Sequence, residues 1–188
     1  MTTKQLRFIT TRQDHRIAAL AALAISIHII ESAFPSPLPG IKPGLANVIT
    51  LFTFIIYGWK TALQVSLLRV LISSLLLGTF LSPAFLLSLS GALLSLLSLC
   101  CTQLPFYGKF KKYQPGAVGY AIISAVSHMS GQFLVAWYFF IPHPGLFKLL
   151  PIFMTIAVIL GLLSGIITHI ILHKFTTSEI SNLQKDAL

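Results

Sequence analysis

Several polar side chains lie inside apolar stretches of this sequence, where water is scarce. They are Glu31, Asn47, Arg69, His128 and Gln132. On membrane-insertion scales an Arg or Glu at bilayer depth costs about 2.5 to 3.5 kcal/mol, so such residues are candidates for function. His128 and Gln132 are four positions apart, which places both on one face of a helix. The set predicts a binding site for a small, partly anionic molecule, with Arg69 as its deep positive charge.

The segment before Asn47 is suited to closing such a site. Residues 35–47 read PSPLPGIKPGLAN, with prolines that stiffen the chain and glycines that permit a close backbone approach. A helix that starts at Gly44 presents free N–H groups beside Lys42, and such groups favour an anion. We therefore expect Lys42 and Gly44 to join the substrate-binding residues and this loop to act as a lid.

Other polar residues in the apolar stretches are interpreted as helix contacts. Polar groups often tie membrane helices together at about 0.6 kcal/mol per contact. We assign Gln64, Ser73 and Ser74 to this class. For Asn47 and Gln132 both interpretations stay open.

The surrounding sequence indicates a membrane protein. Of its 188 residues 55% are hydrophobic and 9% are charged, whereas about 25% are charged in a soluble domain. A spanning helix needs about 20 mostly apolar residues. Six stretches are predicted to be membrane helices: Ile17 to Phe34, Gly44 to Gly58, Thr61 to Phe80, Ser82 to Leu104, Gly116 to Phe140 and Lys148 to Leu172. The second stretch is short, so we expect it to border irregular backbone or a cavity.

Basic residues set the expected orientation. With the amino terminus in the cytoplasm, the outer side holds Lys42 and Lys148, and the inner side holds Lys4, Arg7, Arg12, Arg16, Lys60, Lys109, Lys111, Lys112, Lys174 and Lys185. Cytoplasmic loops carry an excess of Lys and Arg, so both termini are expected to be cytoplasmic. The predicted fold is an all-α membrane protein, a single compact bundle of six transmembrane helices. A basic cytoplasmic segment covers residues 1–16, the membrane domain covers 17–172 and a cytoplasmic tail covers 173–188.

These spans place the polar residues at two depths. Arg69 lies about 16 Å from the outer end of its helix at Phe80, whereas Glu31 and Asn47 lie about 4.5 Å below the outer boundary. We expect a polar column that opens outward, with Glu31, Asn47 and Gln132 near its mouth and Arg69 and His128 at its floor.

The remaining composition argues against other functions. The net charge of +9 could suggest nucleic acid, but the basic residues lie in short clusters between apolar stretches, so we interpret the charge as topology. Cys100 and Cys101 are adjacent, where a disulfide would be strained, and their role is left open. His169 and His173 lie one turn apart without an acidic or cysteine partner nearby, so neither a metal nor a resident cofactor is predicted.

Four segments carry a resemblance to a known family. They read IESAFPSPLPGIKPGLANVITL, LLRVLISSLLLGTF, LSLSGALLSLL and HMSGQFLVAWYF, in this order. Together they resemble the Gx transporter family, often labelled heptaprenyl diphosphate synthase component I, over about residues 17–172. That family is similar to the S components of energy-coupling-factor transporters, which are six-helix membrane proteins that catch a vitamin-like molecule from outside. S components work with a coupling protein and paired ATPases.

The resemblance also implies site residues. It points to Glu31, Gly44, Asn47, Arg69, Gly78, His128 and Gln132. The chain departs from the family pattern at Met129, where an Asn is expected beside the histidine. If that position touches the ligand in relatives, the substrate of this chain differs from theirs.

The leading hypothesis is therefore an S-component-like substrate-binding subunit of the bacterial inner membrane. It would take up a small vitamin- or cofactor-like molecule, with flavin-, quinone- and isoprenoid-related compounds as candidates. The sequence has no GxxxxGK[ST] motif, so energy would come from separate coupling and ATPase subunits.

The alternative is a non-catalytic membrane accessory, either of a quinone or flavin redox system or of prenyl diphosphate synthesis. Catalysis itself is not predicted. Elongation of prenyl diphosphates needs acidic clusters that hold magnesium. The two nearest acidic residues in the chain, Glu179 and Asp186, are seven positions apart.

Overall fold

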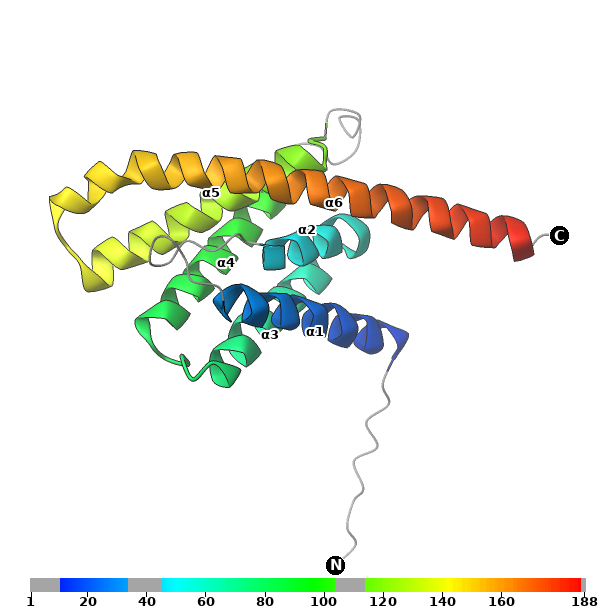
Figure 1. The fold of residues 1–188 in the computed structure, drawn as a ribbon, viewed down its shortest axis with the longest axis horizontal. Helices are drawn as coiled ribbons and strands as arrows, with labels where there is room; N and C mark the ends of the chain where they lie inside the picture. Colours follow the sequence, from blue (N-terminus) through cyan, green and yellow to red (C-terminus); the bar gives the residue numbers. More distant parts are fainter. Residues whose placement is uncertain (1–10, 34–44, 104–113, 187–188) are drawn as a thin grey trace, which may run out of the picture.

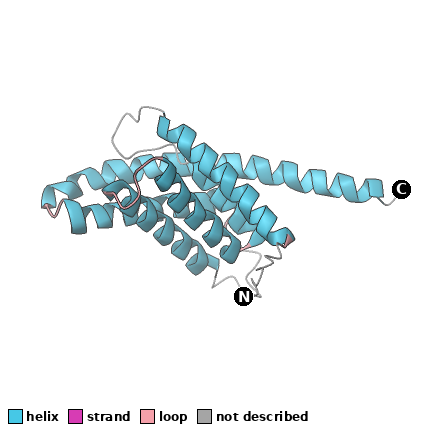
Figure 2. Ribbon diagram, turned by 90° about the horizontal axis from the view of Figure 1, so that it is seen from below, coloured by secondary structure: helices cyan, strands magenta, loops and turns pink. Residues whose placement is uncertain are grey.

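A computed structural model describes residues 11–33, 45–103 and 114–186, and every regular element in these ranges is a helix (Figures 1 and 2). The α-helices are α1 (Arg12–Ala33), α2 (Leu45–Tyr57), α3 (Trp59–Leu76), α4 (Pro83–Gln103), α5 (Ala117–Val135) and α6 (Leu150–Asp186). A π-helix, η3 (Ala136–Phe140), continues α5, and a 3₁₀-helix, η4 (Pro144–Leu149), precedes α6. The prediction of an all-helical chain is confirmed for these ranges.

Five of the helical segments are long and apolar enough to cross a membrane. They are α1, α3, α4, α5 with η3, and α6 with η4, while α2 is a shorter apolar helix of 13 residues. This is the make-up of a multi-pass membrane protein. The prediction that the second stretch is short agrees with the length of α2, which spans about 20 Å.

Helix α3 ends earlier than predicted, at Leu76 instead of Phe80. Gly78 adopts a left-handed conformation with φ of 68°. Its N–H group bonds to the carbonyl of Leu75, and the N–H group of Thr79 bonds to the carbonyl of Ser74. This pair of bonds is a Schellman motif, which closes a helix at a glycine. The boundary shift moves Arg69 closer to the end of its helix, to about 10 Å from it.

Two other boundaries also differ from the prediction. Helix α1 begins at Arg12, inside the segment expected to be a basic extension. Helix α6 has 37 residues and continues past Leu172 to Asp186, and its last part extends beyond the other helices (Figures 1 and 2). In Figure 1 the first residues of α1 and the last residues of α6 lie at the same end of the bundle.

Small residues allow the helices to approach closely. A β-carbon added to Gly165 would lie 2.7 Å from the Cα atom of Val118, and one added to Gly161 would lie 2.9 Å from the Cβ atom of Ala125. Both glycines therefore sit at the contact between α5 and α6, where small residues four positions apart let membrane helices approach closely. Ala18 and Ala22, by contrast, are exposed on the outer surface of α1.

The buried apolar core of the described residues consists of three clusters. Its main cluster joins α2, α3, α4 and α5 through Leu51, Phe54, Ala62, Leu96, Leu99, Tyr120 and Ala121. Because α2 is short, this packing fills the end of the bundle toward which α2 runs.

Candidate functional site

A cavity of about 480 Å³ lies inside the bundle, and all six α-helices contribute to its wall. The contributions come from the last turns of α1, the first turns of α2, the second half of α3, the first turns of α4, most of α5 from its second turn onward and the first half of α6. Since consecutive helices run in opposite directions, these stretches meet in one half of the bundle. That half is the one away from the start of α1 and the finish of α6. A volume of this size is in the range of small-molecule sites.

Five of the seven residues predicted to bind substrate line this cavity: Glu31, Asn47, Arg69, His128 and Gln132. They come from four different helices, so the fold and not the sequence spacing brings them together. Lys42 and Gly44 lie outside the described residues.

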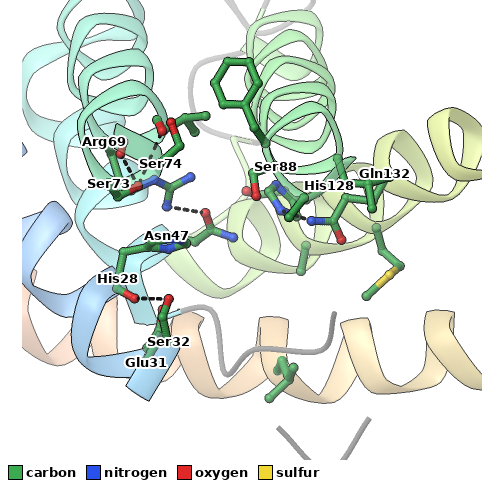
Figure 3. Close-up of a pocket in the computed structure, with 18 of the residues that line it drawn as sticks. His28, Glu31, Ser32, Asn47, Arg69, Ser73, Ser74, Ser88, His128 and Gln132 are labelled. Carbon is green, nitrogen blue, oxygen red and sulfur yellow. Dashed lines mark hydrogen bonds between the residues drawn. The ribbon is translucent and has the colours of Figure 1, made fainter. Parts of the chain in front are cut away.

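Arg69 is the central charge of the cavity. Its side chain is on the inward face of α3, and the residue is 5% exposed. The guanidinium donates a hydrogen bond from Nη1 to Oδ1 of Asn47 at 2.9 Å, as Figure 3 shows. This bond brings the head group of Arg69 to the amide of Asn47, so the side chains of the two layers expected from the sequence meet. The physical reason is the early end of α3, together with the length of the arginine side chain.

Glu31 supplies the opposite charge. It lies in the last turns of α1, is 6% exposed and interacts electrostatically with Arg69. A buried cation is far less costly when an anion and hydrogen-bond acceptors are close to it. The arrangement therefore lets α3 hold a permanent positive charge in the apolar interior.

His128 and Gln132 form a second polar group on α5. The two side chains are joined through their Nε2 atoms at 3.2 Å, which confirms that they share a helix face. The ring of His128 lies against Gly91 of α4, because a β-carbon on Gly91 would be 2.8 Å from Cε1 of the ring. Nδ1 is buried and makes no hydrogen bond within the described residues.

The remaining wall is partly hydroxyl-bearing and partly apolar. Ser73 and Ser74 line the cavity, and their hydroxyl groups donate to carbonyls of their own helix, those of Arg69 and Leu71. The apolar part includes Leu51 and Ala121, which also belong to the core cluster. The wall therefore combines apolar side chains with the hydroxyl groups of Ser124 and Ser164, and the depth order expected from the sequence stays a prediction.

Other residues that were not predicted to bind substrate also line the cavity. His28 and Ser32 line the cavity beside Glu31, and the three-residue spacing from His28 to Glu31 was the available signal. Ser88 comes from α4, whose polar residues carried no signal apart from being serines. Met129 also lines the cavity, so the position at which the chain departs from the family pattern is part of the wall.

No metal site accompanies these residues in the described ranges, where groups of three or more His, Cys, Asp or Glu side chains are absent. His169 and His173 are exposed on α6. The described side chains that line the cavity offer hydrogen bonding and charge through one guanidinium, one carboxylate, amides, imidazoles and hydroxyls.

Comparison with known proteins decides the family. The profile described as heptaprenyl diphosphate synthase component I matches residues 20–171, well over half of the chain. The chain belongs to this family. No curated protein and no solved structure matches it. The matched region of this heptaprenyl diphosphate synthase component I family member contains the whole cavity, from His28 to Ser164.

Proposed function

We propose that the chain is a substrate-binding membrane subunit, similar in role to the S components of energy-coupling-factor transporters. It captures a small vitamin- or cofactor-like, partly anionic molecule from outside the cytoplasm. A separate coupling protein with ATPase subunits supplies the energy. In this proposal the membrane is the bacterial cytoplasmic membrane and both termini are cytoplasmic.

One observation carries the proposal: a buried guanidinium borders an open cavity in the interior of the bundle. Arg69 is 5% exposed, yet the space beside it, of about 480 Å³, is not filled by the described side chains. A charge at bilayer depth is costly, and an accessory scaffold would be served better by a filled, apolar interior. The cavity lies at the end of the bundle away from the start of α1, which is the outer end in this orientation.

The second candidate function follows from the family name. A component I implies a partner component, so in the second candidate function the chain is a membrane anchor for a separate prenyl-chain enzyme. In that case the cavity would hold or present an isoprenoid lipid, and the protein would remain non-catalytic. The widely spaced acidic residues of the sequence favour a non-catalytic role in both cases.

Native mass spectrometry of the protein extracted in mild detergent tests the proposal. We expect a small molecule to co-purify with the wild-type chain and to be lost from Arg69→Leu, while both proteins remain folded. Arg16→Leu is the matched control, since Arg16 is exposed and lies over the ring of Tyr57, outside the cavity. Equal retention by Arg69→Leu and wild type would refute the role of the buried charge. A bound isoprenoid together with a prenyl-chain enzyme would select the second function.

A further inference from the structure

The amide of Asn47 is held in one orientation by Arg69. A guanidinium has N–H donors and no acceptor, so the Asn47 atom that lies 2.9 Å from Nη1 has to be the oxygen. The amide nitrogen is then the atom on the other branch of the side chain. The hydrogen bond thus determines which branch of the Asn47 amide is the oxygen and which is the nitrogen, an assignment that is ambiguous for an isolated asparagine.

The fixed amide nitrogen faces the cavity. Figure 3 shows it on the branch that points away from Arg69, toward the side of the cavity that carries His128 and Gln132. Asn47 lines the cavity, and within the described residues its Nδ2 atom has no hydrogen-bond partner. An amide NH₂ group therefore stands ready to donate into the open space.

Arg69 provides further donors at the same place. The guanidinium carries five N–H donors, and in the described part of the chain it donates one hydrogen bond, to Asn47. Arg69 and Asn47 both line the cavity, and their hydrogen bond holds the guanidinium next to the amide. Donors from two side chains thus converge on one wall.

We infer that the polar head of the ligand is an oxyanion, a carboxylate or a phosphate, held by a fork of Arg69 and Asn47 N–H groups. Two neighbouring oxygen acceptors match two neighbouring donors, as in other charge-assisted pairs. The apolar part of the lining, at Leu51 and Ala121, then faces the remainder of the ligand. This inference rests on the proposed function, because it names the chemistry that the same cavity recognises.

The substitution Asn47→Asp separates a binding role from a structural one. The new carboxylate keeps an acceptor for Arg69, so the link between α2 and α3 is preserved and the unfolding temperature is not lowered. The second oxygen replaces the donor, however, and repels an oxyanion. We expect the amount of co-purified small molecule to fall at least tenfold in Asn47→Asp. In the matched control Gln64→Glu, the same change on the exposed side of α3, retention is expected to stay at the wild-type level.

Probes with one shared body test the head group directly. The series consists of 4-phenylbutyrate, 3-phenylpropyl phosphate, 4-phenylbutan-1-ol and 4-phenylbutylamine, added to ligand-stripped wild-type protein with thermal unfolding as the readout. We expect one or both of the two acids to raise the unfolding temperature and the amine to leave it unchanged. The acid that raises the unfolding temperature more indicates whether the head group is a carboxylate or a phosphate. Asn47→Ala provides the same comparison if Asn47→Asp does not fold.

The outcomes are distinguishable from failure of the proposed function. If the wild-type chain retains no small molecule and responds to none of the four probes, the proposed function falls and the inference falls with it. If the wild-type chain retains a small molecule and Asn47→Asp retains it equally, the cavity is a binding site but the fork is wrong. A response to the amine equal to that of the acids also overturns the oxyanion head.

Discussion

The imidazole ring of His128 lies directly against Gly91, so that a single added carbon on the glycine would be 2.8 to 2.9 Å from three atoms of the ring. This contact joins α4 to α5 beside the cavity and fixes the position of the ring. Because the ring in turn pairs with Gln132, one glycine determines where a whole polar group lies.

Gly91→Ala is therefore expected to displace the His128 ring. Added volume in a packed interior costs about 1 to 3 kcal/mol, and the ring has to leave its pairing with Gln132. We expect a lower unfolding temperature and weaker retention of the co-purified molecule, measured on the same preparation. Gly116→Ala is the control, since its new β-carbon meets nothing within 4 Å. An unchanged protein would show that the ring has room to move.

The contact between α5 and α6 offers a paired test. Gly161→Ala places its β-carbon 2.9 Å from that of Ala125, so we expect a destabilisation of about 1 to 3 kcal/mol. Ala125→Gly removes the opposing carbon, and in the double variant the loss should be smaller than the sum of the two single losses. Equilibrium unfolding of the four proteins measures this coupling. Additive losses would mean that the two carbons do not meet.

Ser95 and Ser124 form a buried hydrogen bond between α4 and α5, with their hydroxyl oxygens 2.7 Å apart. Such bonds in membrane proteins contribute about 0.6 kcal/mol on average. A double-mutant cycle with Ser95→Ala and Ser124→Ala is expected to give a coupling free energy of this size. Since Ser124 also lines the cavity, ligand retention should be recorded in parallel. A coupling of zero would assign both hydroxyls to other roles.

The orientation of the bundle is open to labelling with membrane-impermeant thiol reagents. In a variant without Cys100 and Cys101, a cysteine replacing the exposed Pro142, between η3 and η4, should react from outside the cell. A cysteine replacing the exposed Thr177, near the end of α6, should react after the membrane is opened. The reverse pattern would place the cavity at the cytoplasmic side and contradict capture from outside.

Much of the helical framework was predictable because apolar length is a strong signal. The stretches chosen by that criterion overlap each of α1 to α6, and the shortness of α2 was visible in the sequence. The end of α3 was missed because Gly78 reads as one more small residue inside an apolar stretch. Its left-handed conformation, and the Schellman motif that depends on it, belong to the three-dimensional chain.

The polar residues of the cavity were predictable because a polar or charged side chain in an apolar stretch costs free energy. The residues with which they pair were not predictable. Arg69 and His128 are conspicuous in apolar sequence, whereas the hydrogen bond from Arg69 to Asn47 joins residues 22 positions apart. Depth estimates even set these two residues in different layers. The contact between His128 and Gly91 was equally unpredictable, because a glycine in a membrane helix usually indicates packing between helices.

Helix α6 is longer than a bilayer is thick. Its apolar, membrane-compatible part ends at Phe175, and the helix goes on to Asp186, which adds about 16 Å at 1.5 Å per residue. The hydrocarbon layer itself is about 30 Å deep. The end of α6 thus extends past its membrane-compatible part as a continuous helix. A soluble macromolecule that approaches this side of the membrane would contact the helix before it reached the lipid head groups.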